Sequence, residues 1–147
     1  MTGHEQRWQS ADMPHLKVEY SGNLEPRIDF AALLRSAHEA AFDVGCFAPN
    51  SIRSRAVRRD VFVVGDGDPA NAFVHVEIRI RPGRSAEQKH RLVRAVFEHI
   101  WGVLEPVHCN SPVGLTVEVQ EIDIEFRLFR ENFEEHADAR ASAKSNG

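Results

Sequence analysis

An alternation of apolar and polar residues occurs twice in this chain, 60 positions apart, and it limits the possible folds more than any other feature. The apolar positions of the two runs are Leu16, Val18 and Tyr20, then Val74, Val76, Ile78 and Ile80. A period of two residues is typical of a strand with one buried face. The same offset carries Val57 onto Val117. The repeat therefore predicts two fused half-units related by a pseudo-twofold axis.

A segment with helical periodicity follows each of these strands. Asp29 is placed to cap the first helix, and Gly45 is placed to end it. Ser85 and Gln88 have the spacing of a capping box, and Pro106 should stop this second helix. The two apolar stripes recur at steps of three and four residues, at Phe30, Leu33, Leu34, Ala37, Ala41 and Val44, and at Leu92, Val93, Val96, Phe97, Ile100, Trp101 and Leu104.

A further strand is predicted after each helix, at residues 51–57 and 115–119, so the order is strand, helix, strand, twice. The apolar residues 61–64 precede a glycine-rich stretch at 65–69 that is typical of a hairpin turn. Apolar residues alternate again over 122–128, but in the opposite phase. A bulge or a break near residues 120–121 would explain that change.

This order predicts an α/β fold of the α+β kind, in which both helices lie on one face of a small mixed sheet. Self-association is the simplest cover for the opposite face. We expect one domain at 13–132, with half-units at 13–60 and 72–120. Residues 1–12 lack periodicity and are expected to be an extension that is either not translated or disordered. Residues 133–147 are polar and predict a short helix or a solvated tail.

Composition narrows the classes of partner. The chain has 18 Lys and Arg against 22 Asp and Glu, a net charge of -4, which argues against a protein that tracks nucleic-acid phosphates. No apolar run is long enough to span a membrane, and the N-terminus lacks the apolar core of a secretory signal. Cys46 and Cys109 form no metal-binding or disulfide pattern and fit a reducing cytoplasm.

The tripeptide Met13-Pro14-His15 at the start of the first strand carries a family resemblance. Read from Met13 to about Asn132, the chain resembles the 5-carboxymethyl-2-hydroxymuconate isomerase family of the tautomerase superfamily. The matching stretches, in order, are PHLKVEYS at 14–21, SIRSR at 51–55, AFVH at 72–75 and GRS at 83–85. Each motif is weak alone, but their order and spacing on a doubled frame make the resemblance specific.

The resemblance implies a tautomerase-like homotrimer that needs no metal and no organic cofactor. It implies an intramolecular isomerase that ketonises a dienol di- or tricarboxylate during the breakdown of aromatic acids, in the homoprotocatechuate pathway. Pro14 matches the catalytic base of the family. Arg53 and Arg84 match the arginines that hold substrate carboxylates, for which a forked, permanently charged guanidinium is suited. The competing interpretations are a solvated strand edge for Arg53 and a turn residue for Arg84.

The chemistry requires Pro14 to carry a free secondary amine. An α-amino group has a reference pKa of about 7.7–8.0. Burial and nearby arginines both disfavour the cation and should lower that pKa toward the working pH, where a base is most effective. The rigid pyrrolidine ring also fixes the direction of the lone pair.

The residues before Pro14 are the one departure from the family pattern. If they persist, the nitrogen of Pro14 is an amide and has no useful basicity. Translation from Met13, followed by removal of that methionine, would expose the amine. If the extension persists instead, the sequence predicts a non-catalytic trimeric relative that binds anions. Another tautomerase activity, such as keto-enol tautomerisation of a phenylpyruvate-like acid, stays open beside these two.

Overall fold

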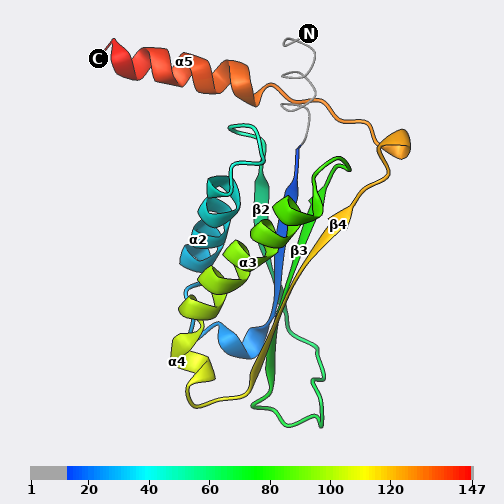
Figure 1. Cartoon of the computed structure of the whole chain (residues 1–147). Helices are drawn as coiled ribbons and strands as arrows, with labels where there is room; N and C mark the ends of the chain where they lie inside the picture. Colours follow the sequence, from blue (N-terminus) through cyan, green and yellow to red (C-terminus); the bar gives the residue numbers. More distant parts are fainter. Residues whose placement is uncertain (1–12, 147) are drawn as a thin grey trace.

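The computed structural model describes residues 13–146, so the predicted extension at 1–12 lies outside the described residues. Figure 1 shows the elements in chain order. They are β1 (His15–Ser21), the 3₁₀ turn η1 (Gly22–Leu24), α2 (Phe30–Asp43), β2 (Arg53–Arg59), β3 (Ala72–Ile80), α3 (Ala86–Val103), α4 (Glu105–His108), β4 (Val113–Glu121), the 3₁₀ turn η2 (Ile124–Phe126) and α5 (Phe133–Ser145).

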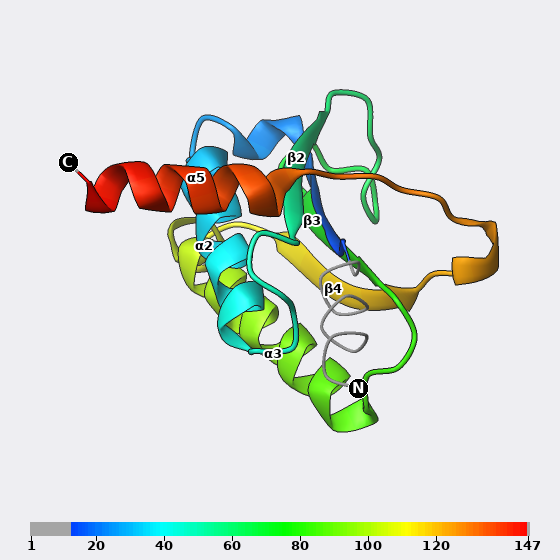
Figure 2. The same cartoon turned by 90° about the horizontal axis from the view of Figure 1, so that it is seen from above.

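Four strands form one mixed sheet in the order β2-β1-β3-β4. β1 runs parallel to β2, β3 runs parallel to β4, and the two central strands are antiparallel. Helices α2 and α3 lie side by side on one face of this sheet, as Figures 1 and 2 show from two directions. The predicted fold class, with both helices on one face of a mixed sheet, is confirmed.

The pairing of β1 with β3 follows the predicted pseudo-twofold axis. Leu16 pairs with Ile78, and Val18 pairs with Val76. The counterparts of Leu16 and Ile78, 60 positions away in the other half-unit, are Val76 and Val18, which form the second pair. Lys17 pairs with Glu77, its own counterpart, so this pair lies on the axis. The repeat seen in the sequence is thus a true symmetry of the central ladder.

The core lies between the sheet and the two helices. The apolar faces of β1 and β3 are buried against α2 and α3, and the largest fully buried side chains include Leu16, Leu24, Leu33, Ile78, Ile80, Leu92, Ile100 and Leu104. Both predicted helix starts are confirmed. The Asp29 side chain accepts a hydrogen bond from the amide of Ala32 at 3.2 Å, and Ser85 with Gln88 forms the full capping box.

Two predictions about chain connections are wrong. Residues 61–69 do not connect two paired strands of a hairpin, because β1 lies between β2 and β3 in the sheet. Val61 and Val63 are 97% and 84% exposed, so this apolar run belongs to a surface loop. The chain does break after Glu121, as expected, but residues 122–128 form no strand; they contain the 3₁₀ turn η2 instead.

The offset that relates β2 to β4 also needs correction. Arg53 pairs with His15, whereas Thr116 pairs with His75, so these outer strands are related by 63 positions and not by 60. The second crossover is longer because α3 is followed by α4, which has Pro106 in its first turn. Proline fits the first turn of a helix, so Pro106 begins a new helix here as well as ending the old one. β2 itself starts at Arg53, two residues later than predicted.

Beyond η2 the chain crosses one end of the sheet and enters α5, a helix with no buried residues (Figure 1). This agrees with the polar character of the C-terminal segment. Among residues 13–146, none of the helices combines the length and the hydropathy that crossing a bilayer requires.

Candidate active site

Pro14 is buried immediately before β1. Its carbonyl oxygen accepts a hydrogen bond from the amide of Arg53 at 2.9 Å, which continues the parallel ladder by one residue. The fold therefore places the predicted base and one predicted substrate-binding arginine next to each other, although 38 residues separate them in the sequence.

Arg53 and its neighbours form a cationic row across the helix-free face. In the register of the sheet, His15 lies between Arg53 on β2 and Arg79 on β3. The guanidinium of Arg53 lies 4.9 Å from the centre of the Phe133 ring, at the start of α5. This cation–π contact gives the side chain a defined direction, toward the end of the sheet where β1 begins.

Arg84 reaches the same end of the sheet by another route. It follows β3, whose last residues lie beside the start of the antiparallel β1. Its Nε and Nη2 atoms donate to the carbonyl oxygen of Cys46 at 3.1 and 2.7 Å, and its guanidinium stacks 4.6 Å from the centre of the Phe47 ring. Burial lowers the pKa of Arg84, but a guanidinium stays charged at neutral pH.

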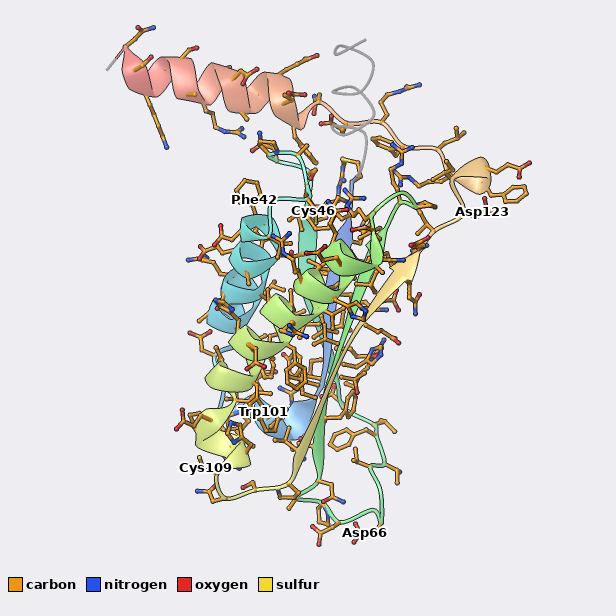
Figure 3. All side chains as sticks on the ribbon, in the orientation of Figure 1. Phe42, Cys46, Asp66, Trp101, Cys109 and Asp123 are labelled. Carbon is orange, nitrogen blue, oxygen red and sulfur yellow. The ribbon has the colours of Figure 1, made fainter. Side chains whose placement is uncertain are left out.

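Figure 3 shows Cys46 at the upper end of the sheet, opposite Asp66 in the loop between β2 and β3. Pro14, Arg53 and Arg84 therefore share one end of the molecule. We find no predicted site residue displaced to the other end.

His15 is held neutral beside this row. Burial and the charges of Arg55, Arg53, Arg79 and Arg127 all lower the pKa of its imidazole. Nη1 of Arg55 lies 3.1 Å from Nδ1 of His15. Because a guanidinium only donates, Nδ1 must accept, and the proton of the neutral ring is on Nε2.

Sequence reasoning missed Arg127 as a member of this group. Partial burial and the charges of Arg81, Arg53 and Arg79 lower the pKa of Arg127. Arg127 belongs to the segment after β4. Its neighbours in the sequence, Phe126 and Leu128, match no motif that would indicate a binding site. Only the return of the chain across the end of the sheet brings it toward Arg53 and Arg79.

Among residues 13–146, neither a metal site nor the open hollow described below involves the predicted site residues. In the described part of the chain, no three His, Cys, Asp or Glu side chains are grouped so that they could hold a metal ion. An open hollow of about 550 Å³ is lined by Tyr20, Glu25, Phe30 and Leu34, among others. It lies at the far end of β1 from Pro14, over the stacked rings of Tyr20 and Phe30, and contains none of the predicted site residues.

Comparisons with known proteins identify the family of the chain. A family model described as 5-carboxymethyl-2-hydroxymuconate isomerase matches residues 14–137. The 5-carboxymethyl-2-hydroxymuconate Delta-isomerase of Escherichia coli is 29% identical over 110 residues, which cover 75% of this chain and 87% of that protein.

Solved structures extend the likeness to the fold. The crystal structure of a 5-carboxymethyl-2-hydroxymuconate isomerase from Deinococcus radiodurans R1 superposes with a TM-score of 0.79 at 29% identity, over 86% of this chain and 95% of that one. A fused 4-OT protein described as a symmetric trimer has a TM-score of 0.53 at 22% identity, over 74% of this chain and 85% of that one, and shows the fold alone. The family match covers most of the chain and starts at Pro14, and on that evidence the chain belongs to the 5-carboxymethyl-2-hydroxymuconate isomerase family, whose members are isomerases with the tautomerase fold.

Proposed function

We propose that this enzyme ketonises 5-carboxymethyl-2-hydroxymuconate or a closely similar dienol carboxylate, with the amine of Pro14 as the base. The observation that carries the proposal is that the family match begins at Pro14, and that Pro14 lies in contact with Arg53 at the cationic end of the sheet. The substrate class is the one for which the relatives are named. Its carboxylates complement the arginines gathered there.

The reaction is an isomerisation, so no atom is gained or lost. The neutral nitrogen of Pro14 takes the proton of the 2-hydroxyl group, the C–O bond becomes a carbonyl, and the electron pair moves along the diene. The proton is then delivered from Pro14 to carbon. Delivery to the far end of the diene gives the conjugated ketone, and delivery to the nearer carbon gives the unconjugated ketone. A buried amine beside Arg53 is expected to have a pKa below its reference value, so it is neutral at the start of the cycle.

Arg53 and Arg84 would each bind a substrate carboxylate or the developing oxyanion. Arg84 is held by the Cys46 carbonyl and the Phe47 ring, and Arg53 is held over Phe133. Side chains that are already oriented lose less conformational entropy when the ligand binds. This supports a role as preorganised anion-binding groups, and not as freely moving surface charges.

The proposal requires a chain that begins at Pro14. Met13 is 3% exposed but is not part of the connected core, and its φ of 44° is a left-handed value that disfavours a non-glycine residue. While Met13 is present it fills space beside the nitrogen of Pro14, and that nitrogen is an amide. Cleavage after Met13 would release the strained residue, clear the space and create the amine in one step.

We also propose that the functional assembly is a homotrimer. The two edge strands carry opposite charge, with Arg53, Arg55 and Arg59 on β2, and Glu118 and Glu121 on β4. A ring of three copies would set the β4 edge of one copy beside the β2 edge of the next, so that opposite charges meet at a head-to-tail interface that closes. The fused 4-OT protein with this fold is described as a symmetric trimer. Because Cys46 and Cys109 are free thiols, we propose the reducing cytoplasm as its compartment.

Intact-mass measurement on the purified protein, followed by an assay of dienol ketonisation, tests the proposal. We expect a mass that corresponds to residues 14–147, turnover without added cofactor, and a light-scattering mass three times that of the chain. A mass that retains the residues before Pro14, together with no turnover, would identify a non-catalytic anion-binding relative. Turnover of phenylpyruvate alone would identify a different tautomerase, and a monomer in solution would contradict the ring.

A further inference from the structure

The segment between β4 and α5, residues 122–132, crosses the end of the sheet at which β1 begins. It leaves the β4 edge where the amide of Ile122 donates to the carbonyl oxygen of Ile80 at 2.9 Å. It reaches the β2 edge where Phe133 lies under the guanidinium of Arg53. Figures 1 and 2 show this crossing in orange, and Figure 3 places Asp123 at its outer turn. The segment is therefore anchored at both edges and passes over the candidate active site.

Arg127 lies within this segment, and it is more buried than the apolar residues on either side of it. Phe126 is 82% exposed and Leu128 is 100% exposed, whereas Arg127 between them is partly buried. The Arg127 guanidinium lies 4.5 Å from the centre of the Phe129 ring. Apolar side chains normally turn inward and arginines outward, because a charge loses hydration when it is buried. The fold thus turns the cation toward the protein. This costs hydration free energy, which burying Phe126 or Leu128 would not.

Arg127 turns inward toward other cations. Arg53 and Arg79 flank His15 in the sheet register, and Arg81 continues the chain beyond β3. The fields of Arg53, Arg79 and Arg81 lower the pKa of Arg127 in addition to the effect of burial. Within this row, Oε1 of Glu77 lies 3.9 Å from Nε of Arg79. Such a concentration of positive charge beside Pro14 draws an anion and strengthens its binding.

The ligand of the proposed reaction has three carboxylates, two from the muconate chain and one from the carboxymethyl branch. Arg53 and Arg84 account for two of them. We propose that Arg127 is a substrate-binding residue that holds the third carboxylate, and that it thereby selects tricarboxylate over dicarboxylate dienols. This inference rests on the proposed function, since it assigns a further residue of the same site. It differs from that proposal in predicting discrimination between substrates, and not turnover itself.

The test compares two dienols on the processed, full-length enzyme: 5-carboxymethyl-2-hydroxymuconate, and 2-hydroxymuconate, which lacks the carboxymethyl branch. We expect Arg127→Gln to raise KM for the tricarboxylate by about 10- to 100-fold, as for a lost charge-assisted hydrogen bond, and to change kcat/KM for the dicarboxylate by less than about twofold. Arg127→Lys should recover part of the loss. Arg130→Gln is the matched control, because Arg130 is an exposed arginine in the same segment.

Equal losses on both substrates would assign Arg127 a general electrostatic or structural role and overturn the proposal, as would no loss on either. Thermal unfolding of each variant separates misfolding from lost binding. If the wild-type enzyme converts neither dienol, the proposed function fails, and calorimetry with inert acids still tests Arg127. In that case we expect tricarballylate to bind more tightly than glutarate to the wild type but not to Arg127→Gln, and equal preference in both proteins would overturn the inference.

Discussion

The two half-units share one frame, but their outer strands differ in charge on the helix-free face. Arg53 and Arg55 on β2 correspond to Thr116 and Glu118 on β4. The central strands exchange charges instead, with Lys17 and Glu19 in the first half against Glu77 and Arg79 in the second. The contrast extends to the two equivalent histidines. His15 faces the guanidinium of Arg55 at 3.1 Å, whereas Nε2 of His75 lies 2.8 Å from a carboxylate oxygen of Glu118.

This difference shows how a duplicated frame can hold a single site. Burial of the inward faces requires the same apolar pattern in both halves, so the backbone keeps its pseudo-symmetry. The outward faces are free to diverge. The outer strand of the first half is cationic, and that half begins with a proline. The outer strand of the second half is acidic, and that half has Val74 at the position equivalent to Pro14. We therefore expect one active site per chain, and the two halves serve as controls for each other.

Replacing Pro14 and its counterpart Val74, which are related by the 60-residue offset, should give the largest contrast. In the processed enzyme, we expect Pro14→Ala to lower kcat by about 10²- to 10⁴-fold, the usual contribution of a positioned acid–base group. Val74→Ala should leave kcat within twofold and lower the free energy of unfolding by about 1–3 kcal/mol, because it removes buried methyl groups. Steady-state kinetics and denaturant unfolding measure the two effects. Similar kcat losses in both variants would mean that the halves share the chemistry.

Substitutions that create a cavity beneath each helix should show that the two halves contribute equally to the core, although only one of them carries the chemistry. Leu33 on α2 and Leu92 on α3 are both fully buried. We expect Leu33→Ala and Leu92→Ala each to lower the free energy of unfolding by about 2–5 kcal/mol. Urea titrations at one protein concentration give the values, since the stability of an oligomer depends on concentration. A variant that loses stability in one half only would show that a single half carries the core.

The outer strands offer a comparison for substrate binding. Arg53 and Thr116 occupy equivalent positions opposite His15 and His75. We expect Arg53→Ala to raise KM by about 10- to 100-fold, since hydrogen bonds to charged groups contribute about 1.5–3 kcal/mol. Thr116→Ala should change KM by less than about twofold. If both kinetic constants of Arg53→Ala equal those of the wild type, Arg53 is a solvated edge residue.

The smallest expected effect concerns His15, the histidine of the first half-unit. Its pKa is lowered in the folded protein, chiefly by burial and then by the neighbouring arginines. Below the unfolded pKa of about 6.5, the unfolded chain therefore binds more protons than the folded chain, and His15 lowers stability as the pH falls. Because solvent screens this half-exposed ring, we expect His15→Gln to reduce the loss of stability between pH 7 and 5 by less than about 0.5 kcal/mol. Parallel pH dependences in the two proteins would contradict this assignment.

Local patterns in the sequence predicted most of the secondary structure. The alternation over β1 and β3, the cap at Asp29 and the capping box at Ser85 each depend on residues close together in the chain, and each is confirmed. The predicted hairpin after β2 was wrong because an apolar run followed by glycines describes a turn but not its partner strand. Strand order is a property of pairing between distant segments, and β1 occupies the place that β3 would have needed.

The apolar pattern of the sequence by itself determined the doubled frame, the two helices on one face and the position of Pro14 at the head of a strand. The motifs near Arg53 and Arg84 also marked those residues, and their roles stay proposals. Only the tertiary structure decided that the halves differ in charge at equivalent positions, because equivalence on the outer strands depends on a 63-residue offset set by the longer second crossover. It alone brought Arg127 toward Arg53 and Arg79, since electrostatic neighbours are defined by distance in space and not by separation along the chain.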